Sequence, residues 1–280
     1  MIDSYIALDL ETTGLEPKKE KITEIAALKV EHGQITGRFV TLVNPKRPLT
    51  ERVVELTGIT DDMLKDAPVI ENIIGEVLGF IGDLPLLGHN IRFDYSFLKQ
   101  AAVNQKMEFE CEAVDTLKLC RKLMPEQEKK NLGNACIYYK IEQPLTHRAE
   151  ADALSAHLLY QKLRGLHGED QPELFATMPL NCRMKRQQPA TKRQKEYLQD
   201  LLKCHRINIT VQLNDISRSD ASRLIDKIIL QYRRVKPQNK GGDKMLNMRD
   251  PKVKKIISTV IVVILVLAMI VPMALSALMY

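Results

Sequence analysis

The sequence predicts an α/β fold in which a mixed β-sheet is flanked by helices. Residues 1–45 contain three runs with strand-like alternation of apolar and polar side chains, separated by tight turns. A fourth, wholly apolar run at 84–87 comes before a segment with helical spacing, and the residues up to 165 are mostly helical in pattern. A sheet followed by alternating strands and helices buries its faces against those helices.

The first strand carries the most informative pattern. In residues 6–11, isoleucine and leucine at the even positions alternate with alanine, Asp9 and Glu11, so a strand places both carboxylates on one face. Gly14 then ends the strand in a turn. Carboxylates two residues apart repel each other, and a hard divalent cation between them is the commonest reason for such an arrangement. The strand therefore predicts a metal site, provided that other segments supply further ligands.

The other elements follow from turn residues and apolar spacing. The opening strand is expected to form an antiparallel trio with the next two strands, and His89 and Asn90 are expected to cap the helix that begins after the fourth. Further strands are predicted at 22–30, 35–43 and 84–87, and helices at 61–65, 69–81, through 95–101, at 114–123, at 131–139 and at 149–163.

Three residues further along the chain could meet the first carboxylate pair. Asp94 follows a strand end, where loops commonly place functional groups. Asp152 lies between two alanines in the helix predicted at 149–163. His147 precedes it by five residues, about 140° around a helix, so it is expected in the lead-in turn, reaching the same site from another direction. Taken singly, these residues have commoner roles as helix caps or surface residues.

Taken together, three segments resemble the exonuclease motifs of the DEDDh family, the family of the proofreading epsilon subunit of bacterial DNA polymerase III. The resemblance spans about residues 4 to 165. It implies a ribonuclease H-like fold and 3′→5′ removal of nucleoside monophosphates with two Mg²⁺ or Mn²⁺ ions. The matching segments are Asp9–Leu15, His89–Asp94 and His147–Ala153, with supporting matches at Thr57–Thr60, Ala67–Pro68 and Asp115–Leu117.

The same resemblance assigns roles to the candidate residues. Asp9, Glu11 and Asp152 would hold the metals directly, Asp94 would hold the second partly through water, and His147 would be the general base. Two cations remove the repulsion between a phosphodiester and its attacking hydroxide, and an imidazole can accept a proton near neutral pH. Phe93 and Asn90 are candidate substrate contacts with a structural alternative. Phe93 could instead pack in the core, and Asn90 could instead cap the helix that follows. The candidate substrate contacts are Thr12, Thr13, Gly14, Leu15, Asn90 and Phe93.

A small module is expected beyond the nuclease. Thr191 and Ser217 would cap its two helices, with a strand at 207–213 between them. Basic residues gather at its entrance and could contact nucleic-acid backbones, a solvated basic surface being the equal alternative. A polymerase or other protein is a second candidate partner, since the chain carries no polymerase motif and proofreading would require one. The predicted boundaries are 1–166 for the exonuclease, 167–190 for a linker and 191–234 for the module.

The C-terminal residues predict a membrane anchor. Positions 233–255 contain nine Lys or Arg and two acidic residues, whereas 1–232 carry a net charge of −1. Residues 256–279 contain no charge, and a helix of that length, roughly 36 Å, crosses a hydrocarbon core of about 30 Å. The lysines before it predict a cytoplasmic N-terminal side. We therefore expect a single-pass tail anchor at 256–279, a basic juxtamembrane segment at 235–255 on anionic headgroups, and a cytoplasmic catalytic domain.

The five scattered cysteines, none in Cys-x-x-Cys spacing, predict reduced thiols and no disulfide framework or zinc site. The whole sequence predicts a membrane-tethered, metal-dependent 3′→5′ exonuclease on single-stranded ends, with DNA favoured over RNA. Two alternatives stay open. One is an exoribonuclease of the same family, and the other is a non-catalytic membrane tether that binds nucleic acid through an exonuclease fold.

Overall fold

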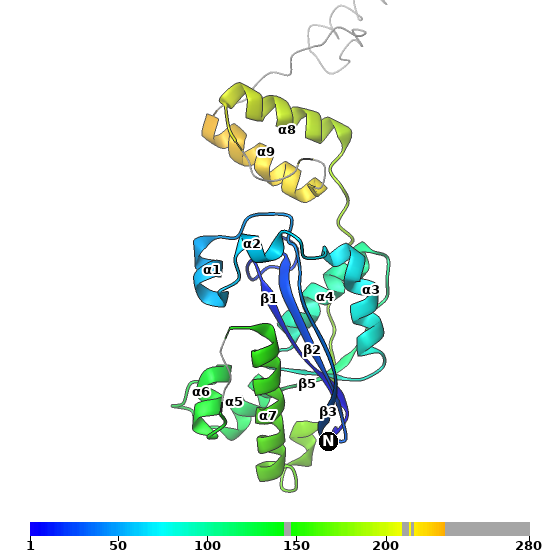
Figure 1. Cartoon of the computed structure of the whole chain (residues 1–280), viewed down its shortest axis with the longest axis vertical. Helices are drawn as coiled ribbons and strands as arrows, with labels where there is room; N and C mark the ends of the chain where they lie inside the picture. Colours follow the sequence, from blue (N-terminus) through cyan, green and yellow to red (C-terminus); the bar gives the residue numbers. More distant parts are fainter. Residues whose placement is uncertain (143–146, 209–212, 214–215, 233–280) are drawn as a thin grey trace, which may run out of the picture. The chain divides into compact units, whose positions relative to one another are not determined.

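The computed structural model describes residues 1–142, 147–208, 213 and 216–232. Over these residues the chain forms a six-stranded mixed sheet in the order β3-β2-β1-β4-β5-β6 (Figure 1). The central strand β1 pairs antiparallel with β2 and parallel with β4, so the predicted antiparallel trio and mixed sheet are confirmed. The strands are β1 (Tyr5–Thr12), β2 (Ile22–Glu31), β3 (Gln34–Leu42), β4 (Leu86–Gly88), β5 (Glu112–Asp115) and β6 (Met178–Pro179).

Strand alternation in β1 divides the core between the two faces of the sheet. Leu8 packs with α3 and α4 on one face, and Ala7 packs with α5, α6 and α7 on the other. Asp9 and Glu11 share the parity of Ala7, so they point to the face that α7 covers. The helices over the two faces are α3 (Ile70–Ile81), α4 (Arg92–Asn104), α5 (Thr116–Leu123), α6 (Leu132–Tyr138) and α7 (Ala149–His167).

Two short elements within residues 1–166 were not predicted from the sequence. Helix α1 (Glu51–Thr57) has no helical apolar repeat, although Gly58 ends it with a left-handed φ of 69°. It precedes α2 (Asp61–Leu64), which was predicted. The helix expected at 114–123 begins only at Thr116, because the residues before it form β5, and Asp115 caps that helix by accepting from the Leu117 N–H.

The segment 167–190, expected to be a linker, is partly built into the sheet. It contains the 3₁₀ helix η1 (Pro172–Phe175) and strand β6, which pairs antiparallel with β5. Phe175 is fully buried and Leu180 is nearly so, each in the apolar core on one side of the sheet. Burial of these side chains fixes the first part of the segment against the sheet, which corrects the prediction of a plain linker.

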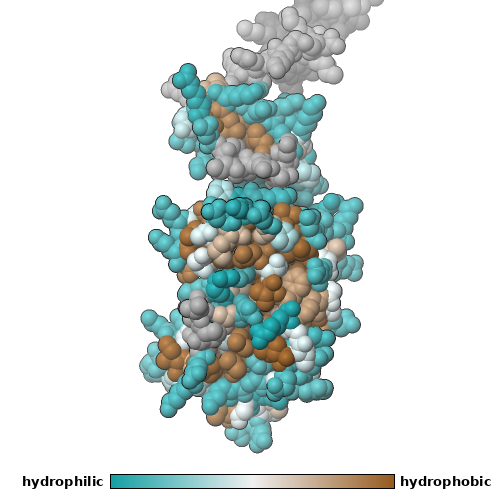
Figure 2. Space-filling model, viewed as in Figure 1, coloured by the Kyte–Doolittle hydropathy of each residue, from teal (hydrophilic) through white to brown (hydrophobic). Residues whose placement is uncertain are grey.

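The small module contains the two expected helices, α8 (Lys192–His205) and α9 (Arg218–Tyr232). Thr191 and Gln194 form a capping box at the start of α8, and Ser217 accepts from the Asp220 N–H at the start of α9, so both predicted caps are confirmed. Figure 2 shows an apolar stripe between the helices, flanked by hydrophilic side chains. Its buried side chains are Ala190, Leu198, Leu201, Leu202, Ile216, Ala221, Ile225 and Ile228.

Several expectations concern residues beyond the described ones. Most of the strand expected at 207–213, the basic segment 235–255 and the membrane helix 256–279 belong to this group. Among the residues that the structure describes, no helix has both the length and the apolar character needed to cross a bilayer.

Candidate active site

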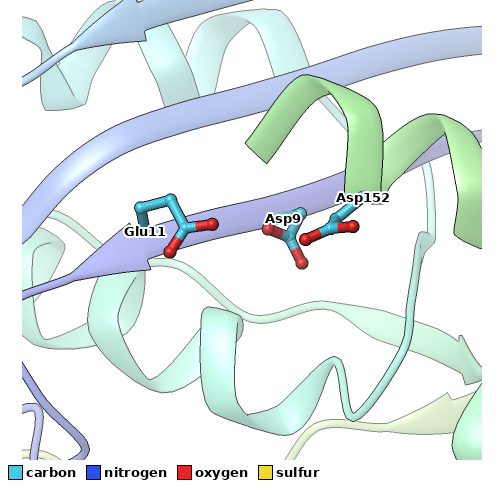
Figure 3. A group of neighbouring side chains, drawn as sticks. All are labelled: Asp9, Glu11 and Asp152. Atoms are coloured by element: carbon cyan, nitrogen blue, oxygen red, sulfur yellow. The ribbon is translucent and has the colours of Figure 1, made fainter. Parts of the chain in front are cut away.

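Three carboxylates from the two ends of the nuclease segment converge at the end of β1. Asp9 and Glu11 lie on β1, and Asp152 lies in the first turn of α7, which packs over them (Figure 3). One carboxylate oxygen from each lies within 4.8 Å of the others, and all three side chains are half-buried. The β1–β2 register shifts directly after Glu11, and such a bulge re-aims the side chains beside it.

Asp94 lies next to this group without being part of it. It is only 3% exposed, and its Oδ1 accepts a hydrogen bond of 3.0 Å from the backbone N–H of Leu10, between Asp9 and Glu11. The charge of Asp94 raises the pKa of Asp9, second only to burial. All four predicted carboxylates are therefore neighbours, three in one cluster and the fourth held against the strand that carries two of them.

Burial raises the pKa of all four candidate carboxyl groups, and repulsion from neighbouring carboxylates adds to it for Asp9, Glu11 and Asp94. The pKa of Asp9 is well above its ordinary value, because of burial first and the charges of Asp94 and Asp152 next. Burial and the Asp152 charge raise the pKa of Glu11 to about 7. Burial also raises the pKa values of Asp94 and Asp152. The site is thus a half-buried acidic cluster that favours either protons or a cation.

A divalent metal fits this donor set. Hard cations such as Mg²⁺ and Mn²⁺ prefer carboxylate oxygens, and the three clustered side chains offer them from two converging elements. The charge of the ion would offset the repulsion among these carboxylates, which adds to burial in raising the pKa of Glu11. Asp9, Glu11 and Asp152 are the residues that would bind it directly, with Asp94 beside them.

His147 lies two residues before the start of α7, next to the N-cap residue Arg148, and is exposed. Its backbone N–H donates a hydrogen bond of 3.2 Å to Oδ2 of Asp152, and its φ of 62° is in the left-handed region. The residue is thus fixed beside a metal-ligand candidate by its backbone, while its ring is open to solvent. This position is the lead-in turn that the sequence indicated.

The loop after β1 is closed by its own side chains. The Thr12 hydroxyl donates to the Gly14 carbonyl at 2.8 Å, and the Thr13 hydroxyl donates to Glu20 at 2.6 Å. A side chain at Gly14 would meet the Glu20 side chain at 2.9 Å, so glycine permits this close approach. Leu15 projects from the loop with 82% of its surface exposed. The loop thus presents one apolar side chain next to the carboxylates.

Asn90 and Phe93, the other candidate substrate contacts, lie between β4 and the first turn of α4. Asn90 is exposed and has a φ of 69°, and its backbone N–H donates to Asp115 at 2.9 Å. Phe93 is half-buried against Phe97, with ring centroids 5.0 Å apart. The side chain of Asn90 is therefore accessible, whereas Phe93 contributes mainly to packing.

The expected capping of α4 by His89 or Asn90 is wrong. The N-cap of α4 is Ile91, which makes no side-chain cap hydrogen bond. The His89 ring instead lies 3.0 Å from the Thr116 hydroxyl and 2.8 Å from the Lys130 carbonyl. His89 therefore ties the loop after β4 to the start of α5, because its burial requires partners for both ring nitrogens.

Sequence reasoning missed Glu24 and Arg148, which lie beside the carboxylate cluster. Glu24 is 2% exposed and accepts two hydrogen bonds from Arg148, one from Nε at 3.0 Å and one from Nη2 at 2.6 Å. The signal available in the sequence was a single charged residue inside the run 22–28, which is otherwise apolar apart from Thr23. Charged residues are rarely buried unless they are paired, so that position predicts a buried partner.

Comparisons with known proteins agree with this geometry. The model of the exonuclease family (RNase_T) matches residues 6–160, more than half of the chain. The PolC-type DNA polymerase III of Halalkalibacterium halodurans is 42% identical over 169 residues, which are 59% of this chain and 12% of that protein. The Bacillus subtilis protein of the same name is 41% identical over 166 residues, 58% of this chain and again 12% of the relative. The chain thus spans about an eighth of the length of these relatives.

Among solved structures, E. coli exonuclease I in complex with a dT13 oligonucleotide has the same fold, with a TM-score of 0.52 at 20% identity. The superposition covers 62% of this chain and 43% of that one. This likeness agrees with the ribonuclease H-like architecture expected from the motifs. The family match confirms the assignment to exonucleases that the three sequence motifs indicated, and the chain therefore belongs to the exonuclease family of enzymes.

Proposed function

We propose that this chain is a divalent-metal-dependent 3′→5′ exonuclease of the DEDDh type that acts on single-stranded DNA ends. The observation that carries the proposal is the convergence of Asp9, Glu11 and Asp152 within 4.8 Å. Asp94 is hydrogen-bonded against the same strand, and His147 is bonded to Asp152. These are the five residues of the family motifs.

The chain's own residues divide the work of hydrolysis. A pair of divalent cations held there would supply positive charge against the phosphodiester and bring the attacking and leaving oxygens into line. Asp9, Glu11 and Asp152 would bind the ions directly, and Asp94 would complete the negative cluster beside them. A ring nitrogen of His147, which is open to solvent, takes the proton from the attacking water.

The loop after β1 supplies the end specificity in this proposal. Thr12, Thr13 and Gly14 offer backbone groups beside the carboxylates, and the exposed Leu15 packs against the terminal base or sugar. Asn90 is a further candidate contact from the opposite loop. DNA is favoured over RNA because the relatives that share about 40% identity with this chain are named DNA polymerases.

Labelled single-stranded oligonucleotides test polarity and substrate together. With Mn²⁺ and the purified full-length protein, a 5′-labelled DNA strand is expected to shorten through a ladder of intermediates. The same strand labelled at its 3′ end should lose its label at once as a mononucleotide. A matched RNA should be cut more slowly. Early loss of a 5′ label would reverse the proposed polarity, and faster cleavage of RNA would make the protein an exoribonuclease.

The rival function is a non-catalytic tether that binds nucleic acid through an exonuclease fold. A scaffold has no requirement for four acidic groups and a histidine around one point, and carboxylates gathered within 4.8 Å repel one another unless a proton or a cation lies between them. Binding of single strands with no Mn²⁺-dependent cleavage would favour the tether.

We further propose that residues 256–279 anchor the protein in a membrane, with the nuclease on the cytoplasmic side. This proposal rests on the charge-free run and the basic residues before it in the sequence. Cell fractionation tests it, since the full chain should remain with membranes washed in high salt and a protein ending at Arg249 should not. A truncated protein that still pellets with washed membranes would contradict the anchor.

The module that contains α8 and α9 is proposed to bind nucleic acid or a protein partner such as a polymerase. The basic residues near its start, among them Lys192, Arg193 and Lys195, support contact with phosphates. Deleting 191–232 should weaken single-strand binding and flatten its salt dependence. Unchanged affinity at all salt concentrations would leave the protein partner as the remaining role, to be sought by co-purification with a polymerase.

A further inference from the structure

An ion pair with a buried carboxylate joins the sheet to the start of α7. The carboxylate of Glu24, on β2, accepts three hydrogen bonds. Arg148 donates two of them, from Nε at 3.0 Å and from Nη2 at 2.6 Å, and the backbone N–H of Ala149 donates the third at 3.0 Å. The Glu24 side chain is 3% exposed, whereas that of Arg148 is 42% exposed. Glu24 is therefore bound on both oxygens by the residues that begin the helix.

Arg148 and Ala149, which bind Glu24, lie in the sequence between His147 and Asp152. Arg148 directly follows His147, and its carbonyl accepts the first helical hydrogen bond, 3.0 Å long, from the Asp152 N–H. The Asp152 carboxylate accepts in turn from the backbone N–H of His147 at 3.2 Å. Any shift of Arg148 would therefore move both the general-base candidate and the third carboxylate.

On the sheet, Glu24 is the direct cross-strand partner of Glu11 in the β1–β2 ladder. Cross-strand partners point to the same face, so Glu24 and Glu11 both face α7. One side chain thus connects the strand register that sets Glu11 to the helix start that sets Asp152.

We infer that Glu24 and Arg148 are positioning residues, which hold Asp152 and His147 against Asp9 and Glu11 in the geometry that binds the metals. This inference rests on the proposed function. The arginine fork suits the task because its planar donors fix direction as well as distance. Partners that orient metal ligands in this way commonly change metal affinity or activity by about 10- to 100-fold when they are removed.

A second ion pair between the sheet and the same turn of α7 provides a matched control. Arg38, on β3, binds Glu150 through its Nη1. The Arg38 side chain is 51% exposed and that of Glu150 is 43% exposed. Exposed pairs contribute little because water and salt screen them. Arg38→Gln therefore removes a sheet-to-helix contact of the same chemistry without disturbing the buried fork.

The experiment compares Glu24→Gln, Arg148→Gln, the double variant and Arg38→Gln as full-length proteins. The double variant keeps the net charge of the pair at zero, so it isolates geometry from electrostatics. Four quantities are measured: kcat and KM on a single-stranded oligonucleotide, Mn²⁺ affinity by calorimetry without oligonucleotide, and the folded fraction by circular dichroism. Arg148→Lys, which keeps the charge but not the fork, replaces any variant that fails to fold.

The double variant is expected to lower kcat and Mn²⁺ affinity by about 10- to 100-fold, with KM for the oligonucleotide within about twofold. Each single variant should lose nearly as much as the double, because the two residues act as one unit. Arg38→Gln should match the wild type. A purely structural pair would lower activity only in proportion to the folded fraction and leave Mn²⁺ affinity unchanged.

Wild-type kcat and wild-type Mn²⁺ affinity in the folded double variant would overturn the inference. So would losses that merely parallel the folded fraction. Failure of the proposed function looks different, because the wild-type protein itself would then bind Mn²⁺ without cutting any oligonucleotide. The calorimetric comparison of the variants would still decide whether the pair positions the metal ligands.

Discussion

The backbone N–H of Leu10 donates a hydrogen bond of 3.0 Å to Oδ1 of Asp94, 84 residues further along the chain. Strand β4 pairs with β1 only at Ile6 and Ala7, so β1 extends beyond its parallel neighbour and its later N–H groups need other partners. Asp94, in the first turn of α4, supplies one. This bond fixes the fourth carboxylate of the site against the strand that carries the first two.

Asp94 is therefore expected to serve both the fold and the chemistry, and two substitutions separate these roles. Asp94→Asn keeps an oxygen for the Leu10 N–H but removes a buried charge, so the metal-free protein should be at least as stable as the wild type while kcat falls. Asp94→Ala leaves that N–H unpaired and should cost about 1–3 kcal/mol. Urea unfolding in EDTA measures both. Equal stabilities of the two variants would contradict the hydrogen bond's role.

The stability of the metal-free protein should fall as pH rises from about 4.5 to about 7. Burial first, and neighbouring carboxylates next, raise the pKa of Glu11 from 4.5 to about 7, so the folded state holds a proton that the unfolded state has already released. Unfolding free energies measured in EDTA across this range test the slope. Glu11→Gln should make the slope shallower, and an unchanged slope in this variant would assign the effect to other groups.

His147→Gln should reduce kcat by about 10²- to 10⁴-fold while Mn²⁺ affinity stays within about twofold. The reason is that the ring is open to solvent and only the backbone N–H of His147 bonds to Asp152, so the substitution leaves the ligand set in place. Oligonucleotide digestion and calorimetry measure the two quantities. A large loss of Mn²⁺ affinity would make His147 a metal ligand and no longer the base.

Gly88→Ala should destabilise the protein by about 1–3 kcal/mol and lower activity. A Cβ at Gly88 would meet the Leu8 carbonyl oxygen at 2.8 Å and the Ile91 side chain at 2.7 Å, displacing the loop that leads to Asp94. Gly79→Ala is the control, since no atom lies within 4 Å of its Cβ position in α3. The control should stabilise by about 0.5–1 kcal/mol. Urea unfolding curves for both variants compare the two sites directly, and equal effects would contradict the steric argument.

Local patterns were sufficient for most of the fold. The alternation in β1 and the caps at Thr191 and Ser217 depend only on residues close together in the sequence, and the structure confirms them. The short elements α1 and β5 were missed because segments of seven and four residues are too short to show a clear helical or strand repeat of apolar side chains. Thr50 before α1 and Gly58 after it were nevertheless readable as its two ends.

Some residues of the site could likewise be predicted from local patterns, and others could not. Asp9 and Glu11 were predictable from strand parity alone, whereas the grouping of Asp94, His147 and Asp152 with them depended on recognising the order of three motifs. The Glu24–Arg148 pair joins residues 124 positions apart, and no local pattern specifies which distant cation meets a buried acid. Sequence shows that Glu24 needs a partner, and only the packing of α7 on the sheet supplies its identity.

The central claim is that carboxylates from distant segments form one metal-dependent hydrolytic site. The most direct measurement is the rate at which the full-length protein releases nucleoside monophosphates from single-stranded DNA in Mn²⁺ and in EDTA. Asp152→Asn is compared with Asp83→Asn, an exposed aspartate outside the cluster. Mn²⁺-dependent release is expected from the wild type and Asp83→Asn, and none from Asp152→Asn. Release by Asp152→Asn at the wild-type rate, or equal release in EDTA, would contradict the central claim.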